Sequence, residues 1–287
     1  MQTQKRMLPV AAVLVAAGLG ASSGLYIKGI GLSSLALAGF RMGVPFFAVL
    51  PYLARRGRML GEKSERKGLW LASGINAVRM LLFVMAYKLT TIGNAVVLLY
   101  LWPIFALVFD CVRFRRWPER AQLGLLALAF GGVVTMNYHR GFSLSSEDFL
   151  GSALMILSAC LFAATVIMFK KALAKVHETD ALFFQNAIGA IVYAPFLFAE
   201  LGGASLHDIG LGLSYGLAVG LVGFGLFFFG MKRLPLFQYS ALAYSEVPFG
   251  LALGVLVLGE DISGTQLAGA AMILGASFVA QRLRTRA

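Results

Sequence analysis

LTTIGNAVVLLYLWPIF (residues 89–105) and LPLFQYSALAYSEVPFG (residues 234–250) are two versions of one pattern. Aligned 145 residues apart (89 with 234), both are apolar and both place a proline at the same position, Pro103 and Pro248. The same register holds without a gap at two further identical pairs: Leu89 with Leu234, and Gly124 with Gly269. Self-similarity at a fixed offset indicates a repeated architecture, so we expect two related halves.

The composition identifies the solvent that surrounds these halves. The 287 residues are 59% hydrophobic and 13% charged, with a mean hydropathy of +0.80. An average soluble domain is about 45–50% apolar and about 25% charged. The excess of apolar residues indicates a lipid bilayer as the main partner of this chain. Cys111 and Cys160 are isolated in or beside apolar runs, so they predict neither a disulfide framework nor a metal site.

The apolar runs are long enough to cross a membrane, which takes roughly 20 residues for a helix. Short connections separate them, and none could hold a soluble domain. We predict ten spans, at about residues 8–27, 32–54, 68–88, 91–112, 120–138, 149–169, 180–200, 208–231, 236–258 and 264–281. The fold class is therefore an all-α membrane protein.

The basic residues punctuate these spans and do not gather on one soluble face, so the net charge of +12 does not indicate nucleic-acid binding. Twenty of the 25 Lys and Arg residues fall on the side of the N-terminus, and only Lys28, Lys88 and Arg140 fall on the other. Positive charge marks the cytoplasmic side. We therefore expect cytoplasmic termini and a multi-pass location in a bacterial-type inner (plasma) membrane.

Five spans in each half require the second half to be inverted relative to the first. The stretch after the fourth span, RFRRWPER (113–120), is basic, whereas its counterpart after the ninth, LGEDISGT (258–265), is acidic. We place the two halves at residues 1–140 and 141–287. Inverted repeats are typical of secondary transporters, whose substrate sites lie near the bilayer midplane at the repeat interface.

These features resemble the drug/metabolite transporter superfamily, and in particular its EamA-type members. ALAGFRMG (36–43) resembles the arginine-bearing second helix of that family. LVLGEDISGTQLAGAAMILGASFVA (256–280) resembles the recurrent ending of its repeat. The likeness covers essentially the whole chain. It implies two inverted five-helix repeats and transport by alternating access without ATP, and the chain has no phosphate loop of the G-x-x-x-x-G-K type.

A narrower resemblance is carried by YLWP (100–103), which is similar to the YddG-type exporters of aromatic and other amino acids. Two features depart from that pattern. The first half lacks the Gly-Glu ending, and ACLFAAT (159–165) has Phe162 where such exporters would carry tryptophan. The resemblance implies export of small metabolites, in particular neutral and aromatic amino acids.

Charges inside spans single out the candidate functional residues. Arg41, Arg79 and Glu246 are the only charged groups well inside predicted spans. Such groups are costly in a membrane and usually face the bundle interior or a water-filled cavity. Pro248 cannot donate a hydrogen bond to the carbonyl of Tyr244, so we expect a bend there. Its counterpart Pro103 predicts a second bend, and both prolines are candidate hinges.

An amino acid needs a cation for its carboxylate, an anion for its ammonium group and an apolar pocket for its side chain. Arg79, Glu246 and nearby aromatic rings supply these types. The helical spacing of Asn76, Arg79 and Phe83 places them on one face. The predicted substrate-binding or cavity residues are Asn76, Arg79, Phe83, Tyr100, Trp102, Phe162, Tyr244 and Glu246.

Other interpretations stay open from the sequence. Glu246 could pair with Arg79 or Arg41, and Arg41 could be purely structural. A multidrug or quaternary-cation exporter would also use Glu246 and aromatic rings, with Glu246 as a possible proton carrier. An enzyme is disfavoured because His139, His177 and His207 lie in loops and no hydrolase or metalloprotease motif occurs. We expect no catalytic residues, no metal and no cofactor.

Overall fold

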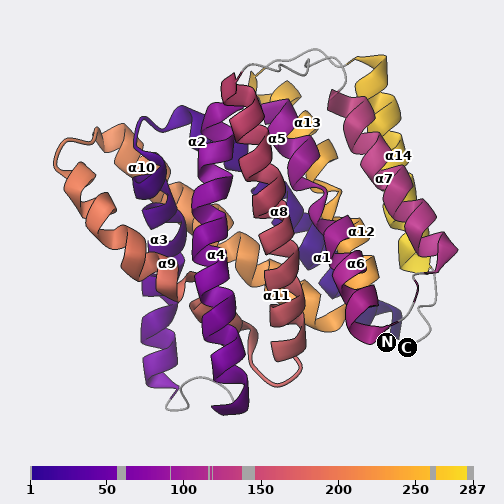
Figure 1. The fold of residues 1–287 in the computed structure, drawn as a ribbon, viewed down its shortest axis with the longest axis horizontal. Coiled ribbons are helices and arrows are strands. Elements are labelled where there is room, and N and C mark those ends of the chain that lie inside the picture. The colour runs from indigo at the N-terminus through magenta and orange to yellow at the C-terminus, as the bar shows by residue number, and fades with distance from the viewer. Residues whose placement is uncertain are drawn as a thin grey trace.

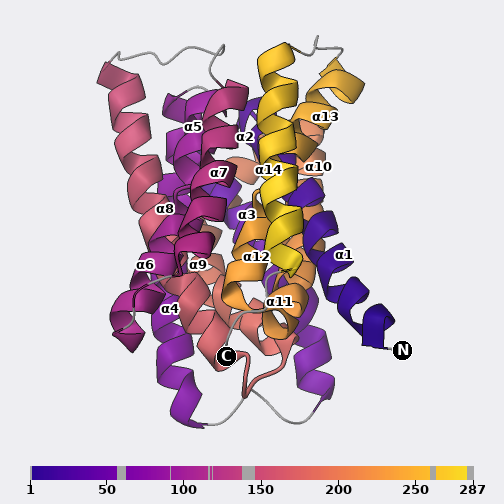
Figure 2. The ribbon, with the colours of Figure 1, turned by 90° about the vertical axis from the view of Figure 1, so that its right-hand side faces the viewer.

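The computed structural model describes residues 2–56, 63–90, 92–115, 117, 119–137, 146–258 and 263–282. All secondary structure in these residues is helical, and the helices run side by side in one bundle (Figures 1 and 2). Seven stretches are long and apolar enough to cross a membrane, and two shorter apolar helices accompany them. The prediction of an all-α membrane protein is confirmed.

Most predicted spans correspond to one continuous helix. These are α3 (Ser34–Arg55), α4 (Lys63–Leu89), α7 (Arg120–Asn137), α8 (Ser146–Ala172), α9 (Glu178–Leu201) and α14 (Gly264–Arg282). The other four spans are divided. The first consists of α1 (Gln2–Ala21) and α2 (Ser23–Gly29), and the fourth of α5 (Ile92–Leu99) and α6 (Trp102–Phe114). The eighth consists of α10 (Leu206–Tyr215), the π-helical η2 (Gly216–Gly223) and α11 (Phe224–Arg233), and the ninth of α12 (Leu236–Ala243) and α13 (Glu246–Leu258).

The packing of the helices has the two-fold pattern expected of two related halves. The second span packs on the seventh (α3 on α9) and the fifth on the tenth (α7 on α14). The third and sixth spans pack together (α4 on α8), as do their counterparts, the eighth and first (α11 on α1). In both views α5 lies above α6 whereas α13 lies above α12, so the two broken spans run in opposite directions (Figures 1 and 2). The halves are therefore inverted. Their predicted boundary at residue 140 and the Gly259–Glu260 motif lie outside the described residues.

Close helix approach depends on glycine at two contacts. A Cβ on Gly132 in α7 would lie 2.6 Å from the carbonyl oxygen of Gly269 in α14. A Cβ on Gly216 would lie 2.6 Å from the carbonyl oxygen of Phe40 in α3, and one on Gly220 would lie 2.9 Å from that of Arg41. Small residues allow backbones to meet in this way inside membranes, where lipid gives no hydrophobic drive to associate.

The fourth and ninth spans break at corresponding positions, and the breaks contact each other. Pro103 and Pro248 each lie in the first turn after a break, where a missing N–H does little harm. Pro248 has no N–H to donate to the carbonyl of Tyr244. That carbonyl accepts instead from the Val247 N–H at 3.1 Å. The Tyr244 hydroxyl donates to the Tyr100 carbonyl at 3.0 Å, and the two rings stack with centroids 5.4 Å apart. The predicted bends are thus present as full helix breaks.

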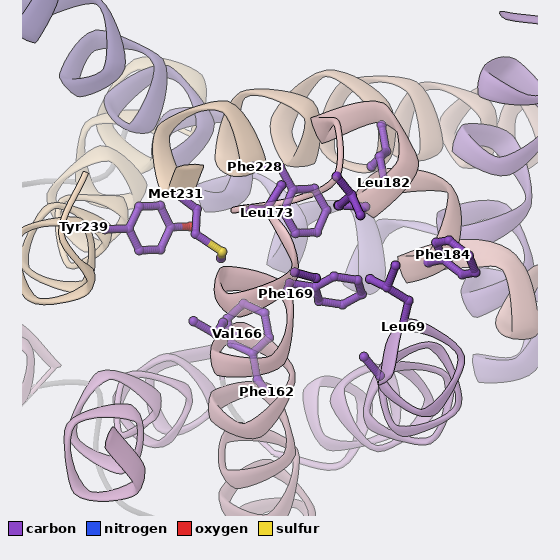
Figure 3. Close-up of a cluster of buried hydrophobic side chains, with 14 of the residues drawn as sticks. Leu69, Phe162, Val166, Phe169, Leu173, Leu182, Phe184, Phe228, Met231 and Tyr239 are labelled. Atoms are coloured by element: carbon purple, nitrogen blue, oxygen red, sulfur yellow. The ribbon is translucent and has the colours of Figure 1, made fainter. Parts of the chain in front are cut away.

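Aromatic and aliphatic side chains of α4, α8, α9, α11 and α12 pack together in one buried cluster (Figure 3). Phe169 of α8 meets Phe228 of α11 with ring centroids 5.1 Å apart. Phe162 and Tyr239 belong to the same cluster, and both also reach the cavity described next. The cluster therefore provides a rigid wall for that cavity.

Candidate functional site

A cavity of about 80 Å³ lies between the two halves. By the same measure one water molecule needs roughly 10–15 Å³, so the cavity has room for several waters or for the polar end of a small metabolite. Its walls come from both halves: α1, α2, α3, α4, α5 and Trp102 of α6 from the first, and α8, α10, η2, α11, α12 and Glu246 of α13 from the second. The prediction of a site at the repeat interface agrees with this position.

Arg79 of α4 lines the cavity and is held from behind by polar groups. It is 3% exposed, and its Nε donates to Oδ1 of Asn76 at 3.1 Å. Asn76 donates in turn to the Gln185 carbonyl of α9 at 2.8 Å. The guanidinium carbon lies 4.6 Å from the centroid of the Phe162 ring, a cation–π distance. Asn76 therefore fixes Arg79 while the far end of the guanidinium remains free to meet a ligand.

Arg41 of α3 is a second guanidinium in the same cavity, and it is 2% exposed. Its nearest partners are ring faces, with centroid distances of 4.6 Å to Phe224 and 5.8 Å to Tyr215. Among the described residues, Glu65 and Glu178 form ion pairs, and these are with Lys175, His177, Lys232 and Arg233, not with Arg41 or Arg79. The cavity thus contains two cationic groups without a carboxylate partner.

Glu246 lines the cavity from the first residue of α13, directly after the break. A helix N-terminus favours a carboxylate because its free N–H groups carry partial positive charge. The carboxylate lies against Gly20 of α1, where an added Cβ would be 2.9 Å from both of its oxygens. No described arginine is within ion-pair distance of Glu246. The structure therefore does not show the alternative arrangement, in which Glu246 would form an ion pair with Arg79 or Arg41.

Aromatic rings form the wall between the charged groups. Trp102 of α6 and Phe162 of α8 meet edge to face with centroids 5.1 Å apart. Phe227 of α11 meets Tyr239 of α12 at 4.9 Å, and Phe224 stacks on Phe227 at 4.8 Å. All of these rings line the cavity, so a ligand would meet flat apolar surfaces between the arginines and the glutamate.

The structure brings together Arg79, Phe83, Trp102, Phe162 and Glu246 from the predicted set. It places the remaining three, Asn76, Tyr100 and Tyr244, behind the lining, where they are buried. Asn76 supports Arg79, and the two tyrosines join the helix breaks. Tyr244 lies away from the cavity because the break turns its ring toward α5 and not toward Glu246.

The cavity also contains residues outside the predicted set, chiefly Arg41, Tyr215, Phe224, Phe227 and Tyr239. The sequence does contain a signal for Arg41, since it is one of three charges inside spans. The aromatic residues carry no such signal, because their helices are apolar on every side. In the sequence, only Glu246 hints at these aromatic residues, because it predicts a cavity. Which rings surround that cavity becomes known only from the fold.

Known proteins with related sequences agree with this architecture. The model of the EamA-like transporter family matches residues 7–138 and again residues 149–281, once for each half. This chain belongs to the EamA-like transporter family. It is accordingly a transporter and not an enzyme, and a multi-pass membrane protein.

Individual relatives are distant. An uncharacterized transporter of Archaeoglobus fulgidus is 27% identical, over 95% of this chain and 96% of the relative. The threonine/homoserine exporter RhtA of Salmonella typhimurium is 25% identical, over 68% of this chain and 64% of the relative. A solved crystal structure superposes with a TM-score of 0.76 over 97% of this chain and 98% of the other, at 16% identity. That last likeness supports the fold alone.

Proposed function

We propose that this transporter exports neutral amino acids, including aromatic ones, from the cytoplasm by alternating access. Arg79 binds the substrate carboxylate, Glu246 binds the ammonium group, and Trp102, Phe162 and Phe83 surround the side chain. The observation that carries this proposal is that one cavity presents an arginine and a glutamate that are unpaired with each other. An amino-acid zwitterion brings the two opposite charges that such a cavity needs.

Two further observations support amino acids as the substrate class. The relative RhtA is a threonine/homoserine exporter, although the match covers only about two thirds of each chain. The YLWP stretch, which resembles YddG-type exporters, puts Trp102 on the cavity wall and Pro103 at the break. Several edge-to-face rings line the cavity, and they would accept an aromatic side chain as readily as a small one.

A quaternary-cation exporter is the competing function. Glu246 and the ring faces would suit a cation, but Arg41 and Arg79 line the same cavity and would repel it. If Glu246 carried protons for such an exporter, Glu246→Gln would flatten the pH dependence of transport while the protein still folded. An unchanged pH profile in that variant would remove the proton-carrier role.

Substrate movement would use the two helix breaks. α5 and α6 meet at Tyr100–Leu101, and α12 and α13 meet at Tyr244–Ser245, so each half-helix can tilt without unpacking its partner half. From the uneven distribution of Lys and Arg we infer that the N-terminus, and with it the start of α1, lies on the cytoplasmic side of an inner membrane. Alternating access then consists of rocking one repeat against the other around the cavity.

Purified protein in liposomes tests the function. Neutral amino acids, small and aromatic, should show saturable uptake and accelerated exchange when the same amino acid is present on the other side. A cationic dye serves as the competing substrate. Dye uptake without any response to amino acids would overturn the proposal.

A further inference from the structure

A neutral amino acid leaves one positive charge in the cavity without a partner. The lining contains two guanidinium groups and one carboxylate, so the empty cavity carries a net charge of +1 from Arg41, Arg79 and Glu246. A zwitterion adds no net charge. Uncompensated charge in a low-dielectric interior is strongly unfavourable, so the loaded cavity calls for one more negative charge.

Arg41 is the cation that has no negative partner when a neutral amino acid occupies the cavity. Arg79 donates to Asn76, whereas Arg41 lies against the rings of Phe224 and Tyr215 and close to the Tyr215 hydroxyl. The helix next to it, η2, is π-helical, and a Cβ on its Gly220 would lie 3.0 Å from Nη1 of Arg41. π-Helical segments are frequent at functional sites. Gly220 therefore leaves the space in which the Arg41 guanidinium sits.

The Tyr215 hydroxyl is an independent sign of a missing ligand. Tyr215 lines the cavity with no exposed surface, and its hydroxyl lies close to Arg41 and Ser23. It nevertheless makes no hydrogen bond of acceptable geometry to any described residue. A buried polar group without a partner is costly, and a bound anion would give this hydroxyl an acceptor.

We propose that Arg41 and Tyr215 form an anion subsite for one small monovalent anionic group, distinct from the Arg79 position that receives the substrate carboxylate. The anion accepts from the guanidinium and from the tyrosine hydroxyl, and it brings the loaded cavity to neutrality. Two sources share this chemistry: a free chloride ion, or the side-chain carboxylate of an acidic amino acid. The inference shares its cavity with the proposed function and rests on it for the role of Arg79.

Chloride binding is measured first, on purified protein without any amino acid, so that the subsite and the proposed function can fail separately. Sodium chloride replaces sodium gluconate at constant ionic strength while thermal unfolding is followed. The wild type should gain stability with chloride in a saturable manner, because a ligand that binds only the folded state stabilises it. Arg41→Gln should lose this saturable shift, and Arg55→Gln, an exposed arginine of the same helix, should keep it.

Tyr215→Phe keeps the test decisive if Arg41→Gln does not fold. Removal of a hydroxyl that has no protein partner should leave unfolding in gluconate unchanged or shifted slightly upward. Chloride affinity should fall about tenfold, the effect of losing one hydrogen bond to a charged group.

A competition experiment identifies whether the anion is chloride or the carboxylate of an acidic amino acid. If an acidic amino acid supplies the anion, aspartate or glutamate displaces chloride in the wild type, and Arg41→Gln loses that competition while neutral amino acids still bind. If chloride itself is the ligand, acidic amino acids do not compete and uptake of neutral amino acids rises with chloride. Absence of any saturable effect of chloride and of acidic amino acids in the wild type, or an effect that stays at the wild-type size in Arg41→Gln and Tyr215→Phe, would overturn the subsite.

Discussion

The chain has one helix break between α5 and α6 and a corresponding break between α12 and α13. The two breaks correspond in backbone arrangement but send different side chains into the cavity. Each places a proline in the following turn, and the Tyr244 hydroxyl joins them through the Tyr100 carbonyl. The first break contributes Trp102 to the cavity, and the second contributes Glu246. At the 145-residue offset (101 with 246) the counterpart of Glu246 is Leu101, which does not line the cavity. The break therefore belongs to the fold, whereas the charge belongs to the site.

The largest expected effect comes from removing that charge. Glu246→Gln keeps the size of the side chain but cannot form a charged hydrogen bond with an ammonium group. Such bonds contribute about 1.5–3 kcal/mol, so affinity for a neutral amino acid should fall about 10- to 100-fold. Inhibition of uptake in liposomes by unlabelled substrate measures it.

The matched control for Glu246→Gln is Leu101→Gln, the same amide at the corresponding position of the other break. Since Leu101 lies off the cavity, its substitution should change affinity far less. Equal losses in the two variants would show that both breaks contribute through the backbone and that the glutamate has no special role.

A methyl group on the facing helix should disturb the carboxylate without changing its charge. In Gly20→Ala the new Cβ would lie 2.8 Å from the carboxylate carbon of Glu246, closer than side chains normally approach. We expect transport to fall several-fold, and Glu246→Asp, which shortens the acid, to restore part of it in the double variant.

Gly29→Ala in α2 is the control for Gly20→Ala, because a Cβ there meets nothing within 4 Å. It should transport normally. If Gly29→Ala lost as much transport as Gly20→Ala, the effect would lie in helix packing and not in the position of the carboxylate.

Trp102 tests what the first break contributes. Trp102→Ala removes a ring that meets Phe162, and contacts between aromatic rings are worth about 0.5–1.5 kcal/mol. Affinity for phenylalanine should fall roughly two- to tenfold, and affinity for threonine should fall less. Competition by the two amino acids against one labelled substrate measures the ratio, and a uniform loss for both would assign Trp102 to packing alone.

The smallest effect concerns the link between the breaks. Tyr244→Phe removes the donor to the Tyr100 carbonyl and should lower the free energy of unfolding by about 0.5–1.5 kcal/mol. Tyr100→Phe keeps the main-chain carbonyl that accepts this bond, so the bond from Tyr244 should persist in that variant. Thermal unfolding in detergent compares the two variants, and an equal loss would contradict a specific stabilising role for the bond between the Tyr244 hydroxyl and the Tyr100 carbonyl.

The same comparison shows which features the sequence can predict. The ten spans, their inversion and the bends at Pro103 and Pro248 follow from hydropathy and from a repeat that prolines mark. The break at Ser22 in the first span is harder to predict, since Ser22 bonds to the Leu19 carbonyl by a local contact that many helices tolerate. The π-helical turn of η2 likewise has no distinct sequence pattern.

All three charges inside spans line the cavity, whereas only three of the five predicted aromatic residues do. Arg79 and Glu246 are costly in lipid, so their presence in a span already indicates a cavity. Tyr239 faces the cavity while Tyr244 faces away from it, although both are tyrosines of one predicted span. The helix break between Ala243 and Glu246 changes which face each residue occupies, and a regular 3.6-residue period cannot predict that change.

In the proposed function the cavity recognises two opposite charges on one substrate. Competition in liposomes by phenylalanine, by its amine without the carboxylate and by its acid without the amino group tests this most directly. We predict that phenylalanine competes at least about tenfold better than either analogue, since each analogue leaves one buried charge unpaired. An amine that competes as well as phenylalanine would contradict the account and favour a cation exporter.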